Sequence, residues 1–259
     1  MQQKKKTEQE RVAGGPCQDC HREHSFQEGD ARTHCLELMQ LLEQEKRIDL
    51  QAQREAADPR LSTASLFGEA RGKMFGVLVC RDTSGSQQIL RAFSGQYNGR
   101  WEVAGWAPPL FNVETFTRIY DDIEPRIKEL GRTLQTADHG SPQWQEQTQQ
   151  RRQLSQQWMC EIHTLYTLTN FRGRQRSLAE AFTGRGGIPT GTGDCCAPKL
   201  FNQAVKENLT PLGLAEFYWG RENASRTRRH GQFYPSCASK CAPILGFMLC
   251  GLDELQIHA

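Results

Sequence analysis

The sequence lacks any long hydrophobic run. No apolar stretch in its 259 residues approaches the roughly 20 residues that a bilayer span requires. The N-terminus, MQQKKKTEQER, carries lysines with no hydrophobic segment behind them, so a signal peptide is not expected either. We therefore expect a cytoplasmic protein without a membrane anchor.

The chain also has little net charge. Its 32 Lys and Arg oppose 30 Asp and Glu, which leaves a formal charge of +2. This balance excludes a surface that binds nucleic acid over the whole molecule, so any such contact must be local. The 37% of hydrophobic residues suffice for one large core or two small ones.

Hydrophobic periodicity predicts an α/β domain over residues 33–259, behind a polar and mobile leader at 1–32. A helix from Cys35 should end at Asp58-Pro59, and a β-hairpin should follow over 75–93. Two helices joined by a Gly/Pro turn form an antiparallel arm inserted at 112–168. Beyond it we expect a helix over 198–207, a strand over 211–220 and a helix started by Pro235.

Ten cysteines in a reducing compartment are typical of metal ligands, reactive thiols or small buried residues rather than disulfides. Cys237 and Cys241 in PSCASKC lie four apart, so both would face one side of a helix near its N-terminus. Cys195 or Cys196, in GDCCAPKL at the start of another helix, could supply a third thiolate. Three protein ligands would leave a zinc ion with one open position, as hydrolytic zinc sites require.

Zinc-dependent nucleobase deaminases carry H-x-E, with Cys allowed for His, and then P-C-x-x-C; the glutamate moves protons. Here the acid is displaced, because the first half reads D-C-C-A and the second has an extra residue. Asp194, directly before Cys195, is favoured as the proton shuttle by adjacency, although Asp is also a preferred helix N-cap. Glu216, in the strand between the two helices, is the other candidate, or else forms a salt bridge with a nearby arginine.

Several segments together are distinctive: GKMFGVLV, AFSGQ, the helical arm, GIPTGTGDCCAPKL, LGLAEFYWG and FYPSCASKCAPIL. From about Cys35 to Leu255 the chain resembles the region ahead of the synthase domain in large bacterial pseudouridine synthases of the RluA type. Some of those proteins are deaminase-synthase fusions that turn a tRNA cytidine into uridine and then pseudouridine.

The resemblance implies a cytidine-deaminase-like mixed sheet flanked by helices, with the arm inserted between the second strand and the first zinc-bearing helix. It implies Cys195, Cys237 and Cys241 as zinc ligands and Cys196 as a lining residue. Pseudouridine synthases need Asp in an H-R-L-D-x-x-T-S-G setting, and Asp49 in KRIDLQAQ lacks the T-S-G. Uridine isomerisation by this polypeptide alone is therefore not expected.

A second group of candidate ligands occurs in CQDCHREH, whose Cys17, Cys20 and His24 have the spacing of a zinc knuckle. Cys35 could complete four ligands. A bare C-x-x-C is a weak pattern, and a polar tail with free thiols is the alternative. Cys80, Cys160 and Cys250 have apolar neighbours and are expected in the core.

Contact with RNA is expected at the loop that follows residue 220, because cationic side chains hold phosphates and aromatic rings stack on an extruded base. The candidates are Arg221, Arg226, Arg228, Arg229, His230 and Tyr234. A solvated charged loop is the alternative for so short a run.

The sequence thus predicts a zinc-dependent deaminase of a base, in particular cytidine, in tRNA or other structured RNA. The displaced acid leaves a second hypothesis open: a deaminase fold that keeps zinc for structure and serves as an RNA-binding module or as the partner of a separate pseudouridine synthase.

Overall fold

The computed structural model describes residues 11–257. A mixed α/β architecture is confirmed, built on a three-stranded antiparallel sheet of order β4-β3-β7. The strands are β3 (Lys73–Arg81), β4 (Gln87–Phe93) and β7 (Thr210–Trp219). The predicted hairpin is β3–β4, and its turn is closed by the Asp82 carboxylate, which accepts the Ser84 and Ser86 amides at 2.9 Å.

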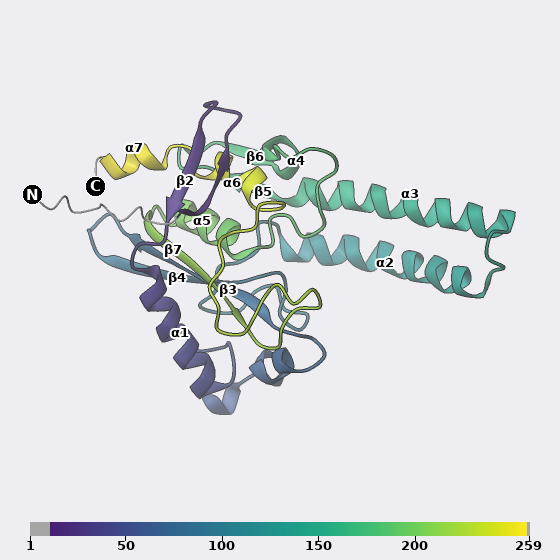
Figure 1. Ribbon diagram of the computed structural model, residues 1–259, viewed down its shortest axis with the longest axis horizontal. Coiled ribbons are helices and arrows are strands. Elements are labelled where there is room, and N and C mark those ends of the chain that lie inside the picture. Colours follow the sequence, from purple (N-terminus) through teal and green to yellow (C-terminus); the bar gives the residue numbers. More distant parts are fainter. Residues whose placement is uncertain (1–10, 258–259) are drawn as a thin grey trace, which may run out of the picture.

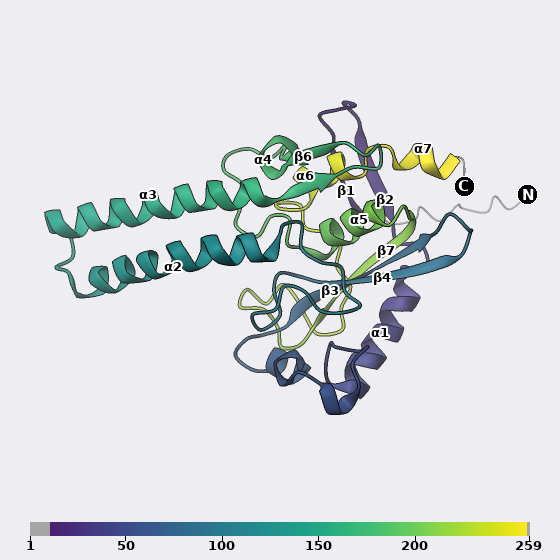
Figure 2. The same cartoon turned by 180° about the vertical axis from the view of Figure 1, so that it is seen from behind.

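Each face of this sheet is covered by a helix (Figures 1 and 2). Phe75, Val77 and Val79 of β3 lie in the core shared with α1 (Ala31–Glu45). Leu78 and Cys80 point to the opposite core, shared with α5 (Cys196–Lys206). This alternation is the period of two that strand geometry imposes. The sheet is therefore the middle layer of three.

The predicted arm is confirmed as α2 (Val113–Thr136) and α3 (Pro142–Leu165), which lie antiparallel and project from the body (Figure 1). The Asn112 and Ser141 side chains cap these helices by accepting the Thr115 and Trp144 amides. Every residue of α2 is at least partly exposed, and Ile162 is the buried residue of α3. Within residues 11–257, no helix is both long and apolar enough to cross a bilayer.

The chain is ordered earlier than the sequence indicated. Residues 1–10 of the expected leader lie outside the described part, but Arg11–Pro16 (β1) and Glu23–Gln27 (β2) form an antiparallel pair, and α1 begins at Ala31. The strand RVAGGP shows little hydrophobic periodicity because its buried residues, Ala13, Gly14 and Gly15, are small.

Two helix boundaries also differ from expectation. Helix α1 ends at Glu45, where Lys46 adopts a left-handed conformation (φ 54°) and its amide closes on the Leu42 carbonyl. The helix expected from Pro235 begins only at Ala242, as α6 (Ala242–Met248). The remaining elements are short: the 3₁₀ turns Arg54–Ala56, Pro59–Leu61 and Thr63–Phe67, strands β5 (Thr167–Thr169) and β6 (Gln175–Ser177), and helices α4 (Leu178–Ala181) and α7 (Leu252–Ile257).

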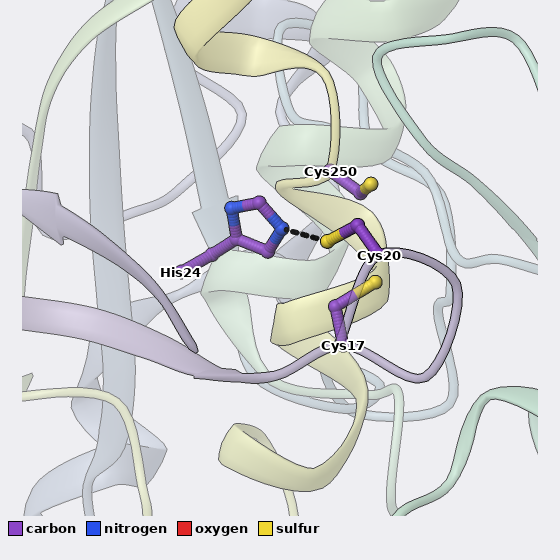
Figure 3. Close-up of side chains that lie close together, drawn as sticks. All are labelled: Cys17, Cys20, His24 and Cys250. Atoms are coloured by element: carbon purple, nitrogen blue, oxygen red, sulfur yellow. Dashed lines mark hydrogen bonds between the residues drawn. The ribbon is translucent and has the colours of Figure 1, made fainter. Parts of the chain in front are cut away.

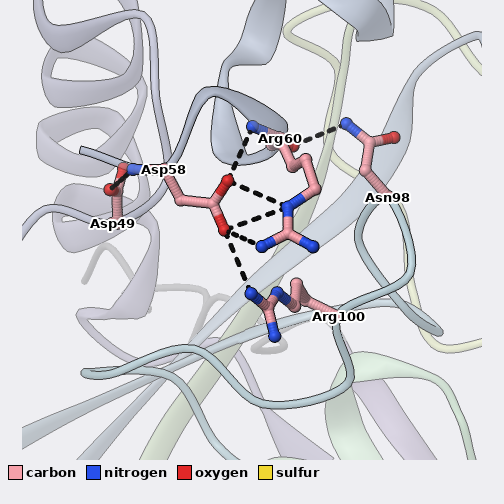
Figure 4. Close-up of polar contacts among 5 residues, drawn as sticks. All are labelled: Asp49, Asp58, Arg60, Asn98 and Arg100. Atoms are coloured by element: carbon pink, nitrogen blue, oxygen red, sulfur yellow. Dashed lines mark hydrogen bonds and ion pairs between the residues drawn. The ribbon is translucent and has the colours of Figure 1, made fainter.

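The segment after α1 is held by carboxylates (Figure 4). Asp49 is buried, and its Oδ2 accepts the Asp58 amide at 3.2 Å. The Asp58 carboxylate accepts hydrogen bonds from the Arg60 side chain and backbone and lies 3.4 Å from the Arg100 Nη2. Asp49 thus ties down the loop that carries Asp58.

Hydrogen bonds from Arg60 lower the pKa of Asp58 to about 2. Because this pKa lies below the ordinary value of about 3.9, the ionised carboxylate stabilises the folded state above that pH, and the contribution is lost as the pH falls toward 2. We expect Asp58→Asn to lower the urea midpoint at pH 6, and the difference from the wild type to shrink to roughly half by pH 3. Asp122→Asn, on the exposed side of α2, is the control; an equal shift at both pH values would contradict the prediction.

Candidate metal centre

Three cysteine side chains from two separate segments meet beside the sheet. The Sγ atoms of Cys195, Cys237 and Cys241 all lie within 4.8 Å of one another, and those of Cys237 and Cys241 are 3.5 Å apart. Among residues 11–257, no fourth His, Cys, Asp or Glu donor joins this group. The three thiols could therefore hold a metal ion and leave one position of a tetrahedral coordination sphere without a protein ligand.

Cys237 and Cys241 lie at the two ends of a hydrogen-bonded turn rather than on one face of a helix. The Cys241 and Ala242 amides both donate to the Cys237 carbonyl at 3.1 Å. Cys241 is the N-cap residue of α6, and Cys195 is that of α5. Cys195 and Cys241 thus each lie at the residue where a helix begins.

Charge on the sulfur atoms is unevenly distributed. Hydrogen bonding with Cys195, and then with Cys241, lowers the pKa of Cys237 to about 2. The same contacts raise the pKa of Cys241, which is buried, while Cys237 and Cys195 are partly exposed. An anionic sulfur beside two more sulfur atoms is the donor set preferred by soft or borderline cations such as zinc.

The two neighbouring cysteines of GDCCAPKL point to different places. Cys196 is fully buried in the core between α5 and β3, and its thiol donates to the Met74 carbonyl at 3.4 Å. Burial raises its pKa well above the ordinary value, so it remains a thiol. Cys195 alone of this pair belongs to the metal centre.

Glu216 is a buried carboxyl group beside the centre. It occupies a position of β7 between Ala215 and Phe217, which face α1, so its side chain points to α5. Its Oε1 accepts the Ala197 amide at 3.2 Å and the Ser236 hydroxyl at 3.0 Å. Burial raises the pKa of Glu216 to about 7, and the charge of Cys237 adds to the rise.

Room for this carboxyl is made by Gly76 on the neighbouring strand, which pairs with Glu216. A Cβ atom at Gly76 would lie 3.3 Å from the Glu216 Cγ and 2.8 Å from the Cys196 Cβ. Any larger residue would push against both the acid and the start of α5.

Asp194, the other candidate acid, has different partners. Its Oδ1 accepts the Tyr166 hydroxyl at 2.7 Å, and its carbonyl accepts the Gly95 amide at 2.8 Å. The buried Lys199 holds the same loop by donating to the carbonyls of Phe93 and Gly95. Asp194 does not act as the N-cap of α5, because Cys195 occupies that position; it joins the arm to the loop that carries Cys195.

A cavity of about 110 Å³ lies next to Glu216. Its walls include Arg11, Arg32, Phe233 and Tyr234, and the Arg32 guanidinium lies 4.1 Å from the centre of the Phe233 ring. Two acids, Glu216 and Glu28, two arginines and two aromatic rings therefore surround one small space, and Arg32 forms an ion pair with Glu28.

The basic loop runs from Arg221 to the cavity wall. Arg228 lies over the Tyr234 ring at 4.2 Å, and the Tyr234 hydroxyl accepts the Arg229 amide at 2.9 Å. The His230 Nδ1 accepts the Gly220 amide. Arg221, Arg226 and Arg229 are exposed. The structure thus places Tyr234 and Arg228 beside Glu216 and uses His230 to hold the loop.

The other cysteines are arranged differently from expectation. Cys17, Cys20 and His24 do come together, but Cys250 joins them in place of Cys35. Cys35 lies in α1, and its thiol donates to the Ala215 carbonyl at 3.4 Å. Cys80 is in the core as expected, whereas Cys160 is exposed on α3. Nothing in the sequence marks Cys250 as a candidate ligand, because only the fold brings it to Cys17.

No protein-family model, characterised protein or solved structure matches this chain. Conclusions about the centre therefore depend on the geometry of its own residues.

The neighbouring residues Cys195 and Cys196 give a direct test of the centre, because only the Cys195 sulfur lies in it. Cys195→Ser should lower the zinc content after chelator dialysis by about one ion per chain, because two thiolates remain. Cys196→Ser should keep that ion, since its sulfur faces the core. Elemental analysis against protein concentration measures both. Equal zinc contents of these two neighbouring variants would contradict the assignment.

Proposed function

We propose that this chain is a zinc-dependent hydrolytic deaminase acting on cytidine in tRNA or another structured RNA. The observation that carries the proposal is the place of the Glu216 carboxyl. In the deaminase pattern the acid stands two residues after the first ligand. Two residues after Cys195 stands Ala197, whose amide donates to the Glu216 carboxyl. A neighbouring strand thus supplies the acid at the position where the pattern needs one.

The order of the elements supports the same interpretation. The hairpin β3–β4 lies beside α5, the arm is inserted between β4 and α5, and the turn before α6 brings the second pair of cysteines to Cys195. This is the order that the resemblance to the deaminase region of RluA-type fusion proteins implies. The order alone would fit a non-catalytic relative equally well, so the position of Glu216 is the observation that favours the enzyme.

When bound by the three thiolates, a zinc ion would supply an activated water for attack on carbon 4 of the pyrimidine ring. Glu216 would take a proton from that water, deliver it to the ring nitrogen, and help ammonia leave as the carbon–nitrogen bond breaks. Cytidine and water thereby become uridine and ammonia. Both of the hydrogen bonds described for Glu216 end on Oε1, which fixes the carboxyl and leaves Oε2 to carry the proton.

Asp194 is less suited to this role. Its Oδ1 is bound to the Tyr166 hydroxyl and it neighbours the buried Lys199, so we assign it to positioning the loop of Cys195. The pKa of Glu216, near 7, also suits a group that must both accept and donate a proton at neutral pH.

Recognition of RNA would fall to the basic loop and the cavity. Arg221, Arg226 and Arg229 are exposed and can neutralise phosphates, whereas Tyr234 and Phe233 offer ring faces beside the acid. A base must leave its stack before an enzyme can react with its ring. Aromatic walls next to Glu216 are consistent with a pocket for such a base.

Purified protein should convert cytidine to uridine in tRNA from its own host, as measured by mass spectrometry of nucleosides. Comparing tRNA from cells with and without the gene would identify the position. Glu216→Gln should lower the rate by about 10²- to 10⁴-fold, the range for a general acid–base group, while the zinc content stays unchanged.

Two variants complete this test. Glu161→Gln, on the exposed side of α3, is the matched control and should keep full activity. Asp194→Asn should retain more activity than Glu216→Gln. If wild-type protein holds zinc but converts no cytidine in any tRNA, the chain is instead an RNA-binding module or the partner of a separate synthase.

A further inference from the structure

The second cluster joins the two ends of the described chain (Figure 3). Cys17, Cys20 and His24 come from the β1–β2 hairpin, and Cys250 comes from the link between α6 and α7. One donor atom from each lies within 4.8 Å of all the others, and the Cys20 Sγ is 3.1 Å from the His24 Nε2. Cys17, His24 and Cys250 are buried.

Three cysteines and one histidine are one of the four-donor sets that hold structural zinc ions. Bonds of about 2.3 Å to sulfur and about 2.0 Å to nitrogen place the ligands of a tetrahedral zinc ion roughly 3.5 to 3.8 Å apart, which the cluster can meet. Three cysteines with one histidine leave no position for water. We propose that this cluster binds a second zinc ion with a structural role, and that this ion holds the segment carrying Cys237 and Cys241 in place.

The loop that carries the first two ligands is fixed independently of any metal. Asp19, between Cys17 and Cys20, is buried, and its Oδ1 lies 2.6 Å from the Arg176 Nη2 of β6. The Cys17 amide donates to the Arg22 carbonyl at 2.9 Å. The loop that carries Cys17 and Cys20 is therefore packed against β6 and lies next to Cys250. It is not a free polar tail.

Contacts between β1 and α6 connect the two clusters. A Cβ atom on Gly15 would lie 1.8 Å from the Ala242 carbonyl oxygen, and one on Gly246 would lie 2.1 Å from that of Pro16. These backbones touch, and only glycine permits it. Ala242 directly follows Cys241, so β1 lies against the residue next to a ligand of the first centre.

Cys237, the other candidate ligand in that turn, is also held in place by β1. The Val12 carbonyl accepts the Ser236 amide at 2.8 Å, one residue before Cys237. Strand β1 thus supports both Cys237 and Cys241, and the second ion fixes β1 at its far end through Cys17. Loss of that ion would loosen the first centre without removing any of its ligands.

Metal analysis of the 259-residue chain tests this proposal. The result does not depend on whether the protein deaminates cytidine. Wild-type protein should carry two zinc ions, and Cys250→Ser should lose one. The remaining ion of Cys250→Ser should exchange with a chromophoric chelator at least about tenfold more readily than in the wild type, as loss of an outer support typically costs. Cys35→Ser is the matched control and should keep both ions at wild-type affinity.

A second variant, in which one candidate ligand replaces another, tests the proposal if Cys250→Ser does not fold. His24→Cys should retain two ions, and its Co²⁺-loaded form should gain sulfur-to-metal charge-transfer absorption, because four thiolates replace three. Two ions in Cys250→Ser, an unchanged Co²⁺ spectrum in His24→Cys, or a Cys17–Cys20 disulfide in freshly purified wild-type protein would each overturn the proposal.

Discussion

Three sulfur atoms within 4.8 Å of one another can share that space only with protons on most of them or with a cation among them. The start of α5 and the turn before α6 must therefore be held close together, because they carry these sulfur atoms. Each segment is held by its own contacts: Lys199 and Gly95 fix the loop before α5, and β1 supports the turn before α6. Surrounding structure thus fixes the spacing of the thiols.

The position of the acid beside these thiols depends on the sheet rather than on helix α5. Alternation along β7 sends Ala215 and Phe217 to one core and Glu216 to the other, where an apolar residue would ordinarily lie. Burying a carboxyl group is costly unless hydrogen bonds compensate it, and Ala197 and Ser236 provide them. These two hydrogen bonds join Glu216 of β7 to residues that lie within two positions of Cys195 and Cys237. The placement of Glu216 is therefore specific to this fold.

Local patterns in the sequence predicted the hairpin, the arm and the strand of Glu216, because each follows from periodicity and turn residues. Spacing and expected helix starts grouped Cys237 and Cys241 with either Cys195 or Cys196, and the structure separates those two because the Cys196 thiol lies in the core. Cys250 could not be grouped in this way, since its apolar neighbours in FMLCGL are typical of a core and its partner Cys17 lies at the other end of the sequence. Sequence spacing could not rank Asp194 against Glu216 either, because the fold brings their hydrogen-bond partners to them, Tyr166 for the first and Ala197 and Ser236 for the second.

The position of Cys250 has a topological consequence. With an ion bound, the hairpin of Cys17 and the link after α6 are tethered, and almost the whole described chain becomes a closed ring. Such a tether reduces the freedom of the unfolded chain, by on the order of 5 kcal/mol for a loop this long in the chain-entropy treatment of cross-links. Complete unravelling of the ring would then have to wait for the ion to dissociate, so a chelator would speed the unfolding of the ion-bound protein.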